Sequence, residues 1–268
     1  MIQISLHGSS FVGSQSGYNP PKSWDECVKT LSDFFEPVET FKQRLENLIL
    51  HVKKLGFECM DIWQPAELNW QWATQDHIKI AKAMIDKHGM KISSLAGEFG
   101  ETRDEFLSAC HLAKGVRAPI LSGTTALFLT DRSFVIETLE RNDLKLAIEN
   151  EVELTAAEML EKIGDGGFGR IGTAIDTGWY STHGYDVIRA IHELKGHIFH
   201  VHLKDVYSGE GHINCGYGKG CVPIKKCVFT LKEIGYSGVL SVENHNLDHD
   251  PDQELIEGRK LVEEWINQ

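Results

Sequence analysis

Residues 197–206, HIFHVHLKDV, form an apolar stretch of strand length that carries three histidines. Because side chains alternate across a strand, His200, His202 and Lys204 share one side. His197 lies on the opposite side at the start of the strand, where we expect a structural role. A buried histidine needs a hydrogen-bond partner or a metal. The stretch therefore predicts a buried strand with a candidate metal ligand.

Seven further apolar stretches of strand length cover residues 2–8, 57–63, 91–97, 117–123, 144–150, 170–178 and 238–245. Apolar residues at helical spacing recur near 41–55, 74–88, 102–114, 131–142, 155–163, 185–195, 224–234 and 253–267. Eight strands, each followed by a helix, predict an α/β fold of the (β/α)8 TIM-barrel type. A doubly wound open sheet fits less well, since it rarely needs eight regular units. We expect a single TIM-barrel domain over residues 1–268.

Residues 9–40 interrupt this repeat. Their first half is rich in Gly, Ser and Pro, and a short aromatic piece, SDFFEP, follows. In a barrel they would form a long loop after the first strand, on the face where active sites lie. This loop is either a lid over the site or a surface elaboration.

The last four predicted strands share one pattern at their carboxyl ends. Each ends in a side chain that can bind a metal: Glu149 in LAIEN, Asp176 in TAIDTG, His202 in HVHLKD and Glu243 in LSVENH. The preceding residues, which point outward, are β-branched: Ile148, Ile175, Val201 and Val242. Two positions before each ligand stand Ala147, Ala174, His200 and Ser241. Three of these are small, so we expect His200 to fill the layer below the ligands rather than bind the metal.

The carboxyl ends of barrel strands converge, so these four side chains should meet at the barrel mouth. Three buried carboxylates would repel one another, and a divalent ion would remove the conflict. A single acidic residue at a strand end is usually a turn residue or helix cap, but four successive strands with one pattern favour a metal site. Three carboxylates and one imidazole suit Mn²⁺, Mg²⁺ or Co²⁺, with Zn²⁺ as a further candidate.

With these residues the chain resembles the xylose isomerase-like TIM-barrel superfamily, and within it the sugar-phosphate isomerase/epimerase branch. That branch holds ketose 3-epimerases, hydroxypyruvate isomerases and inosose dehydratases. The resemblance rests on IEN, IDTG, HVHLKD and VENH and is strongest over 144–245. It implies a divalent metal held by Glu149, Asp176, His202 and Glu243. It also implies that Glu149 and Glu243 are the catalytic acid and base, and that the chain forms a homodimer or homotetramer.

The implied reaction starts from a small keto-sugar or keto-polyol and passes through a metal-stabilised enediolate. Return of the proton to the opposite face gives epimerisation, and its transfer to the neighbouring carbon gives isomerisation. Loss of a β-hydroxyl gives dehydration of the inosose type. The sequence leaves these outcomes open. It also departs from many relatives: Trp179 replaces a His, Asn150 replaces a Pro, and the loop 207–220 has no Arg.

Five residues are candidate substrate contacts. Trp63 and Trp179 lie at or just beyond strand ends and could stack on a sugar face or simply pack in the core. Lys204 and His245 follow a ligand by two positions and could orient hydroxyls or a phosphate, or be solvated rim residues. His212 lies in the glycine-rich loop after the seventh strand.

The composition restricts the alternatives. A net charge of −12 argues against a nucleic-acid or anionic-membrane partner. No apolar run reaches the roughly 18 residues of a membrane span, and the first residues lack a basic signal-peptide region. The six cysteines contain no C-x-x-C pair, which favours free thiols in a cytoplasmic protein.

Two other classes of function stay open at this point. The same superfamily suggests an abasic-site endonuclease-like phosphodiesterase, but such enzymes need extra histidine ligands, and Trp179 takes the place of one. A non-catalytic sugar-binding barrel is the other class, and the complete set of four ligands weighs against it.

Overall fold

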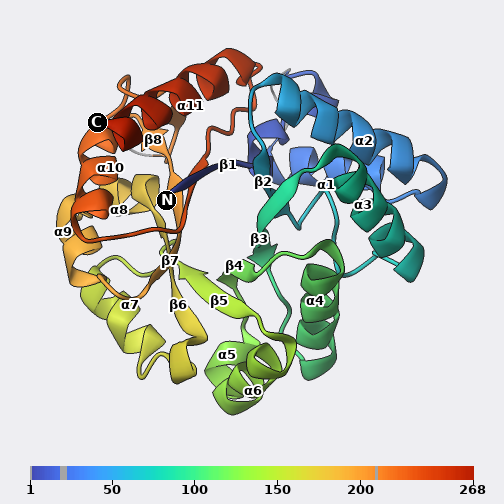
Figure 1. Cartoon of the computed structure of the whole chain (residues 1–268), viewed down its shortest axis with the longest axis horizontal. Coiled ribbons are helices and arrows are strands. Elements are labelled where there is room, and N and C mark those ends of the chain that lie inside the picture. Colours follow the sequence, from blue (N-terminus) through green and yellow to red (C-terminus); the bar gives the residue numbers. More distant parts are fainter. Residues whose placement is uncertain (1, 19–22, 209–210) are drawn as a thin grey trace.

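Eight parallel strands close into a barrel in the order β1-β10-β7-β6-β5-β4-β3-β2. Figure 1 looks down this barrel and shows helices surrounding the strands. The structure is a computed structural model that describes residues 2–18, 23–208 and 211–268. The barrel strands are β1 (Gln3–His7), β2 (Cys59–Trp63), β3 (Lys91–Glu98), β4 (Ile120–Thr124), β5 (Lys145–Glu149), β6 (Ile171–Asp176), β7 (Ile198–Leu203) and β10 (Val239–Val242). The predicted (β/α)8 TIM barrel is confirmed.

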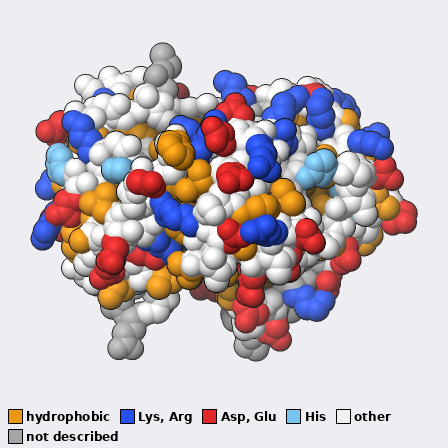
Figure 2. All heavy atoms as spheres, turned by 90° about the horizontal axis from the view of Figure 1, so that it is seen from below, with side chains coloured by type: hydrophobic (Ala, Val, Ile, Leu, Met, Phe, Trp, Pro, Cys, Tyr) orange, Lys and Arg blue, Asp and Glu red, His pale blue; other side chains and the backbone are white. Residues whose placement is uncertain are grey.

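The helices of the described residues are α1 (Trp24–Phe35), α2 (Val38–Lys54), α3 (Gln75–His88), α4 (Arg103–Val116), α5 (Leu127–Thr130), α6 (Arg132–Asn142), α7 (Ala156–Ile163), α8 (Thr177–Thr182), α9 (Val187–Glu193), α10 (Ile224–Glu233) and α11 (Asp252–Asn267). Three short 3₁₀ helices are η1 (Gly8–Phe11), η2 (Ser14–Ser16) and η3 (Gly167–Gly169). Within the described part of the chain, every helix falls short of the length and apolarity needed to cross a membrane. Figure 2 shows acidic and basic side chains intermingled on one face.

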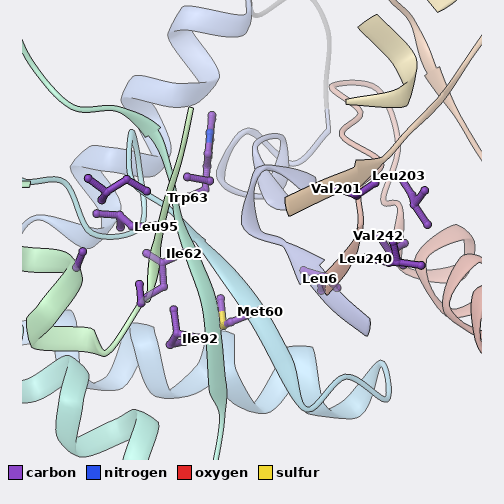
Figure 3. Packing of buried hydrophobic residues seen from close by; sticks show 14 of the residues in the cluster. Leu6, Met60, Ile62, Trp63, Ile92, Leu95, Val201, Leu203, Leu240 and Val242 are labelled. Atoms are coloured by element: carbon purple, nitrogen blue, oxygen red, sulfur yellow. The ribbon is translucent and has the colours of Figure 1, made fainter. Parts of the chain in front are cut away.

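The outward side chains of the strands form the layer that packs against the helices. Ile148, Ile175, Val201 and Val242 are all at most 1% exposed, as their alternation predicts. Figure 3 shows Val201 and Val242 within this packed layer, together with side chains of β1, β2 and β3. The inward side chains are therefore free to carry the polar groups of the barrel.

The strand ends that carry the candidate ligands are staggered rather than level. In the register of the sheet, Asp176 lies opposite His202, whereas Glu149 lies opposite Ala174 and His202 lies opposite Ser241. Each of these two shifts moves the next ligand by two residues along its strand. Such stagger follows from the tilt of strands in a closed barrel. The long side chains of the two glutamates span the difference.

The prediction that residues 9–40 form one long loop is wrong. This segment holds most of η1, then η2, α1 and the start of α2, while residues 19–22 lie outside the described part. Ser23 caps α1 in a reciprocal box with Glu26. Cys27, Leu31 and Phe35 then bury one side of the helix. A lid role of the segment stays a prediction.

The predicted strand 197–206 is interrupted at Lys204. Beyond it, β8 (Asp205–Val206) turns away and pairs antiparallel with β9 (Asn214–Cys215). The Thr177 hydroxyl accepts the Lys204 N–H and donates to the Lys204 carbonyl, both at 2.9 Å. The Asp205 carboxylate accepts backbone N–H groups of the following loop, at Gly218, Gly220 and Val222. These side-chain bonds replace the strand ladder and fix the turn.

Strands β3 and β4 approach each other closely at a pair of glycines, which gives a test of the barrel. Gly97 pairs with Gly123, whose φ is +143°, and a Cβ on Gly123 would lie 1.9 Å from the Gly97 carbonyl oxygen. We expect Gly123→Ala to lower the free energy of unfolding by roughly 3 kcal/mol or more, measured by urea denaturation. Gly184→Ala serves as the control, because Gly184 also has a positive φ, +72°, but a Cβ there would meet open space. We expect this substitution to lower the free energy of unfolding by about 1 kcal/mol. Equal losses in the two variants would contradict the predicted clash.

Candidate metal and substrate site

Four side chains predicted as metal ligands meet at the carboxyl end of the barrel. They are Glu149 at the end of β5, Asp176 at the end of β6, His202 in β7 and Glu243 directly after β10. His202 Nδ1 lies 3.2 Å from Glu149 Oε1 and 3.7 Å from Glu243 Oε2. Potential ligand atoms of Glu149, Asp176 and His202 all lie within 4.8 Å of one another. The structure brings the four together, and their binding of a metal stays a prediction.

Ser122 on β4 orients the His202 imidazole. Its hydroxyl oxygen lies 3.1 Å from His202 Nε2, on the side of the ring away from the carboxylates. When Nε2 carries the proton and donates it to this oxygen, Nδ1 presents its lone pair toward Glu149 and Glu243. Ser122 thus fixes the ring in the orientation that ligation through Nδ1 requires.

The two oxygens of Asp176 have separate partners. Oδ1 accepts the N–H groups of Gly178 at 2.7 Å and Trp179 at 3.2 Å, and so caps α8. Oδ2 lies 2.6 Å from Lys204 Nζ. Only Oδ2 is therefore directed toward the other candidate ligands.

Lys204 is not a solvated rim residue. Its side chain is 3% exposed, and its Nζ lies 2.6 Å from Asp176 Oδ2 and 2.9 Å from Glu243 Oε1. Burial opposes the charged amine, but the carboxylates of Asp176 and Glu243 outweigh it and raise the pKa of Lys204 above its ordinary value. An ammonium from the chain itself therefore joins two of the four candidate ligands.

The carboxylates of the cluster titrate in different ranges. Burial raises the pKa of Asp176 to about 7, against the lowering effect of Lys204. Burial also acts to raise the pKa of Glu149, but His202 overcomes it and lowers that pKa to about 2. In return, Glu149 and Glu243 raise the pKa of His202 to about 9 against the effect of burial. At neutral pH, Glu149 and His202 thus form an ion pair in the metal-free protein.

The donor set fits a divalent cation. Glu243 Oε2 is buried and accepts no hydrogen bond from the described residues, so its lone pairs are available. Carboxylate oxygens from Glu149, Asp176 and Glu243 with one imidazole nitrogen form a mostly hard set. Such an ion would add positive charge where buried carboxylates gather. Metal binding would also require His202 to give up its proton.

Asp61 on β2 is a buried charge that the sequence analysis missed. It is fully buried one layer below the cluster, and the hydroxyls of Ser93 and Ser94 donate to its Oδ1 at 2.5 and 2.9 Å. Ser241 donates to its other oxygen, and His200 Nε2 lies 3.2 Å away. His200 therefore supports the layer beneath the ligands, as its inward position predicts. Alternation in CMDIW was the available signal, because it turns Asp61 inward between two apolar neighbours.

A second group of potential ligand atoms, from His7, Asp61 and His202, also lies within 4.8 Å of one another. It fits a metal less well, because the carboxylate of Asp61 is already surrounded by hydroxyl donors and His200. His7 ends β1, and its Nδ1 lies 2.7 Å from the Ser9 oxygen and 3.9 Å from Glu243 Oε1. We therefore place the candidate metal among the four residues of the upper cluster.

A cavity of about 930 Å³ opens above the cluster. All five residues predicted as substrate contacts line it, together with both glutamates; the five are Trp63, Trp179, Lys204, His212 and His245. Of these five, His245 also contacts the cluster directly, since its Nδ1 lies 3.2 Å from Glu243 Oε1. Contact of these five with a substrate stays a prediction.

Aromatic side chains form two parts of the cavity wall. Trp24 of α1, which the sequence analysis did not single out, lies 5.6 Å from Trp63 and 4.7 Å from His245 between ring centroids. Trp179 stacks on His212 at 3.7 Å with an interplanar angle of 10°. Flat apolar faces of this kind suit the C–H face of a sugar.

The residues that depart from the family pattern have structural partners here. Asn150 Oδ1 accepts the Asp176 N–H at 2.7 Å, and its Nδ2 donates to the Asp176 carbonyl at 3.1 Å. A proline could make neither bond. Asn150 thus ties the end of β5 to the end of β6, while Trp179 forms part of the wall rather than a ligand.

Solved structures share this fold at low sequence identity. The IolI protein with a zinc atom has a TM-score of 0.71 and 14% identity, covering 99% of this chain and 98% of that one. D-psicose 3-epimerase with D-tagatose, from Clostridium cellulolyticum H10, has a TM-score of 0.64 and 14% identity, and the match covers 82% of this chain and 93% of that one. The probable 3-DHS dehydratase AsbF from Bacillus anthracis has a TM-score of 0.66 and 13% identity, covering 98% of this chain and 99% of that one. At these identities the likeness is one of fold alone.

Sequence comparison gives the family. An uncharacterized protein of Methanocaldococcus jannaschii is 25% identical over 142 residues, which cover 50% of this chain and 46% of that protein. The match thus spans slightly less than half the length of this curated relative. A family model for the xylose isomerase-like TIM barrel matches residues 49–265. Since this model covers most of the chain, the chain belongs to the xylose isomerase-like TIM-barrel family.

Proposed function

We propose that this chain is an enzyme, a divalent-metal-dependent isomerase or epimerase of a small keto-sugar or keto-polyol. The observation that carries the proposal is the position of two glutamates beside His202. Glu149 Oε1 and Glu243 Oε2 both face His202 Nδ1, and both side chains line the cavity. A pair of carboxylates at a candidate metal site is what proton transfer next to a carbonyl needs.

The two glutamates would carry the proton. A divalent ion, when bound, supplies a Lewis acid for the carbonyl and hydroxyl oxygens of an α-hydroxy ketone. One glutamate would remove the proton from the hydroxyl-bearing carbon next to the carbonyl, and the other would return a proton to the opposite face of that carbon or to the neighbouring carbon. The glutamate that removes the proton must be ionised, which the lowered pKa values of Glu149 and Glu243 support for either residue, and the other must carry a proton at the moment it returns one. Expulsion of a β-hydroxyl by the same groups would give the inosose-type dehydratase as the alternative.

The charge of the cavity wall favours an uncharged substrate. The acidic residues that line it are Glu98, Glu149, Glu151, Glu153, Glu243, Asp248 and Glu254, and its basic residues are Lys162 and Lys204. Lys162 pairs with Glu153, and Lys204 pairs with Asp176 and Glu243. While Lys204 stays bound to Asp176 and Glu243, each lysine among the described residues of the wall is paired with a carboxylate, so neither is then left to pair with a phosphate. The acidic wall likewise disfavours the phosphodiesterase class, and the paired glutamates disfavour a purely sugar-binding role.

Replacement of the acid/base pair tests the reaction class. We expect Glu243→Gln to reduce solvent deuterium exchange at the carbon next to the carbonyl by on the order of 10²–10⁴-fold, while the circular dichroism spectrum stays unchanged. The exchange would be followed by NMR over a panel of ketoses, inososes and hydroxypyruvate. Glu161→Gln on α7, outside the cavity, serves as the control. Absence of exchange on the whole panel by metal-loaded wild type would contradict the proposal.

Metal content tests the ligand set. We expect about one divalent ion per chain by plasma mass spectrometry after dialysis against Mn²⁺. Asp176→Asn should lower this occupancy because it replaces the one oxygen that faces the cluster. Equal metal content in the Asp176→Asn variant and the wild type would argue against the ligand set.

Substrate charge can be tested with matched pairs of sugars. For any ketose that the enzyme turns over, we expect its terminal phosphate ester to react at least about tenfold more slowly, because the acidic wall repels the phosphate. The measurement is kcat/KM for both members of the pair at constant ionic strength. A faster reaction of the phosphate ester would show that the wall does not select for uncharged substrates.

A further inference from the structure

Lys204 holds two of the four candidate metal ligands. Its Nζ contacts Asp176 Oδ2 at 2.6 Å and Glu243 Oε1 at 2.9 Å, and its side chain is 3% exposed. Because Asp176 Oδ1 caps α8, Oδ2 is the only oxygen that Asp176 can direct to a metal. A divalent ion at the cluster must therefore share or take over an oxygen that already binds the ammonium.

We propose that Lys204 is an internal cation that occupies the Asp176–Glu243 pair in the metal-free protein and is displaced into the cavity when a divalent ion binds. This inference rests on the proposed function, which requires the cluster to bind such an ion. Lys204 then has two roles: it stabilises the empty site and it weakens the affinity of that site for metal.

The backbone around Lys204 allows the side chain, but not the main chain, to move. The Thr177 hydroxyl bonds both the N–H and the carbonyl of Lys204 at 2.9 Å. Displacement is therefore a change in the side-chain rotamers. The stem of the side chain runs along Gly178, where a Cβ would lie 3.1 Å from Lys204 Cγ and Cδ. Glycine at this position makes room for the stem, which a larger residue would crowd.

The cavity provides a place for the displaced amine. Lys204 lines the cavity of about 930 Å³, and so do Glu149 and the more exposed Glu151. These carboxylates offer other counter-charges near the same stem. The reason for an internal cation is electrostatic: removing one partner of a buried ion pair leaves an uncompensated charge, which is strongly destabilising.

Metal affinity separates this inference from the proposed function. Mn²⁺ would be titrated by calorimetry into metal-stripped wild type, Lys204→Met and Lys162→Met, the last being a lysine of the same cavity wall that pairs with Glu153. We expect Lys204→Met to bind Mn²⁺ at least about tenfold more tightly than wild type, and Lys162→Met to stay within about twofold. Metal-free Lys204→Met should also melt at a lower temperature and regain stability with Mn²⁺.

The outcomes are distinct. If wild type binds Mn²⁺ and Lys204→Met binds it no more tightly, the inference is overturned while metal binding stands. If neither protein binds Mn²⁺, both the inference and the metal dependence in the proposed function fail. Binding by Lys204→Met alone would support the inference in its strongest form.

Chemical labelling of the wild type tests displacement directly and does not depend on the folding of a variant. Acetylation of Lys204, followed by mass spectrometry, should be slow without metal and several-fold faster in Mn²⁺-loaded protein. Exposed Lys195 serves as the internal reference. A rate for Lys204 that does not change on metal loading would overturn displacement, even if the affinity of Lys204→Met had risen through loss of charge alone.

Discussion

Two buried carboxylates and a third, Glu149, that is partly exposed impose the charge balance on which this site depends. The strands bring Glu149, Asp176 and Glu243 together, and burial makes three uncompensated negative charges there untenable. In the metal-free protein the compensation comes from the chain itself, through His202 against Glu149 and Lys204 against the other two. The need for positive charge at this point is thus a property of the fold, and a bound ion would be a further way to meet it.

The same requirement extends one layer deeper. Asp61 is fully buried, and His200 holds its pKa well below the ordinary value despite the opposing effect of burial. Small inward residues, Ala147 and Ala174, leave the room that the His200 ring occupies. The ligands therefore rest on a polar layer with its own hydrogen bonds rather than on an apolar core. Side chains supported in this way keep their orientation without a metal.

The barrel and the convergence of the four strand ends that carry the candidate ligands could be predicted because both depend on local periodicity. Alternation places a residue on one side of its strand, and equivalent strand ends converge in a barrel. The burial of Lys204 could not be predicted in this way, since lysine is usually exposed and its partners come from β6 and the end of β10. Trp24 was missed for a similar reason: it reaches the cavity only because α1 packs beside the barrel mouth. Contacts between distant segments leave no periodic signal.

Asp176 is tied to the secondary structure more tightly than the other candidate ligands are. One of its oxygens caps α8, and Asn150 holds its backbone N–H and carbonyl. The position of the second oxygen is therefore determined by secondary structure before any ion or substrate arrives. Side chains rather than a helix end hold Glu149 and Glu243: His202 lies beside Glu149, and Ser9, Lys204 and His245 contact Glu243 Oε1. The fixed position of the Asp176 carboxylate follows from where the residue stands, at the end of one strand and the start of the helix that it caps.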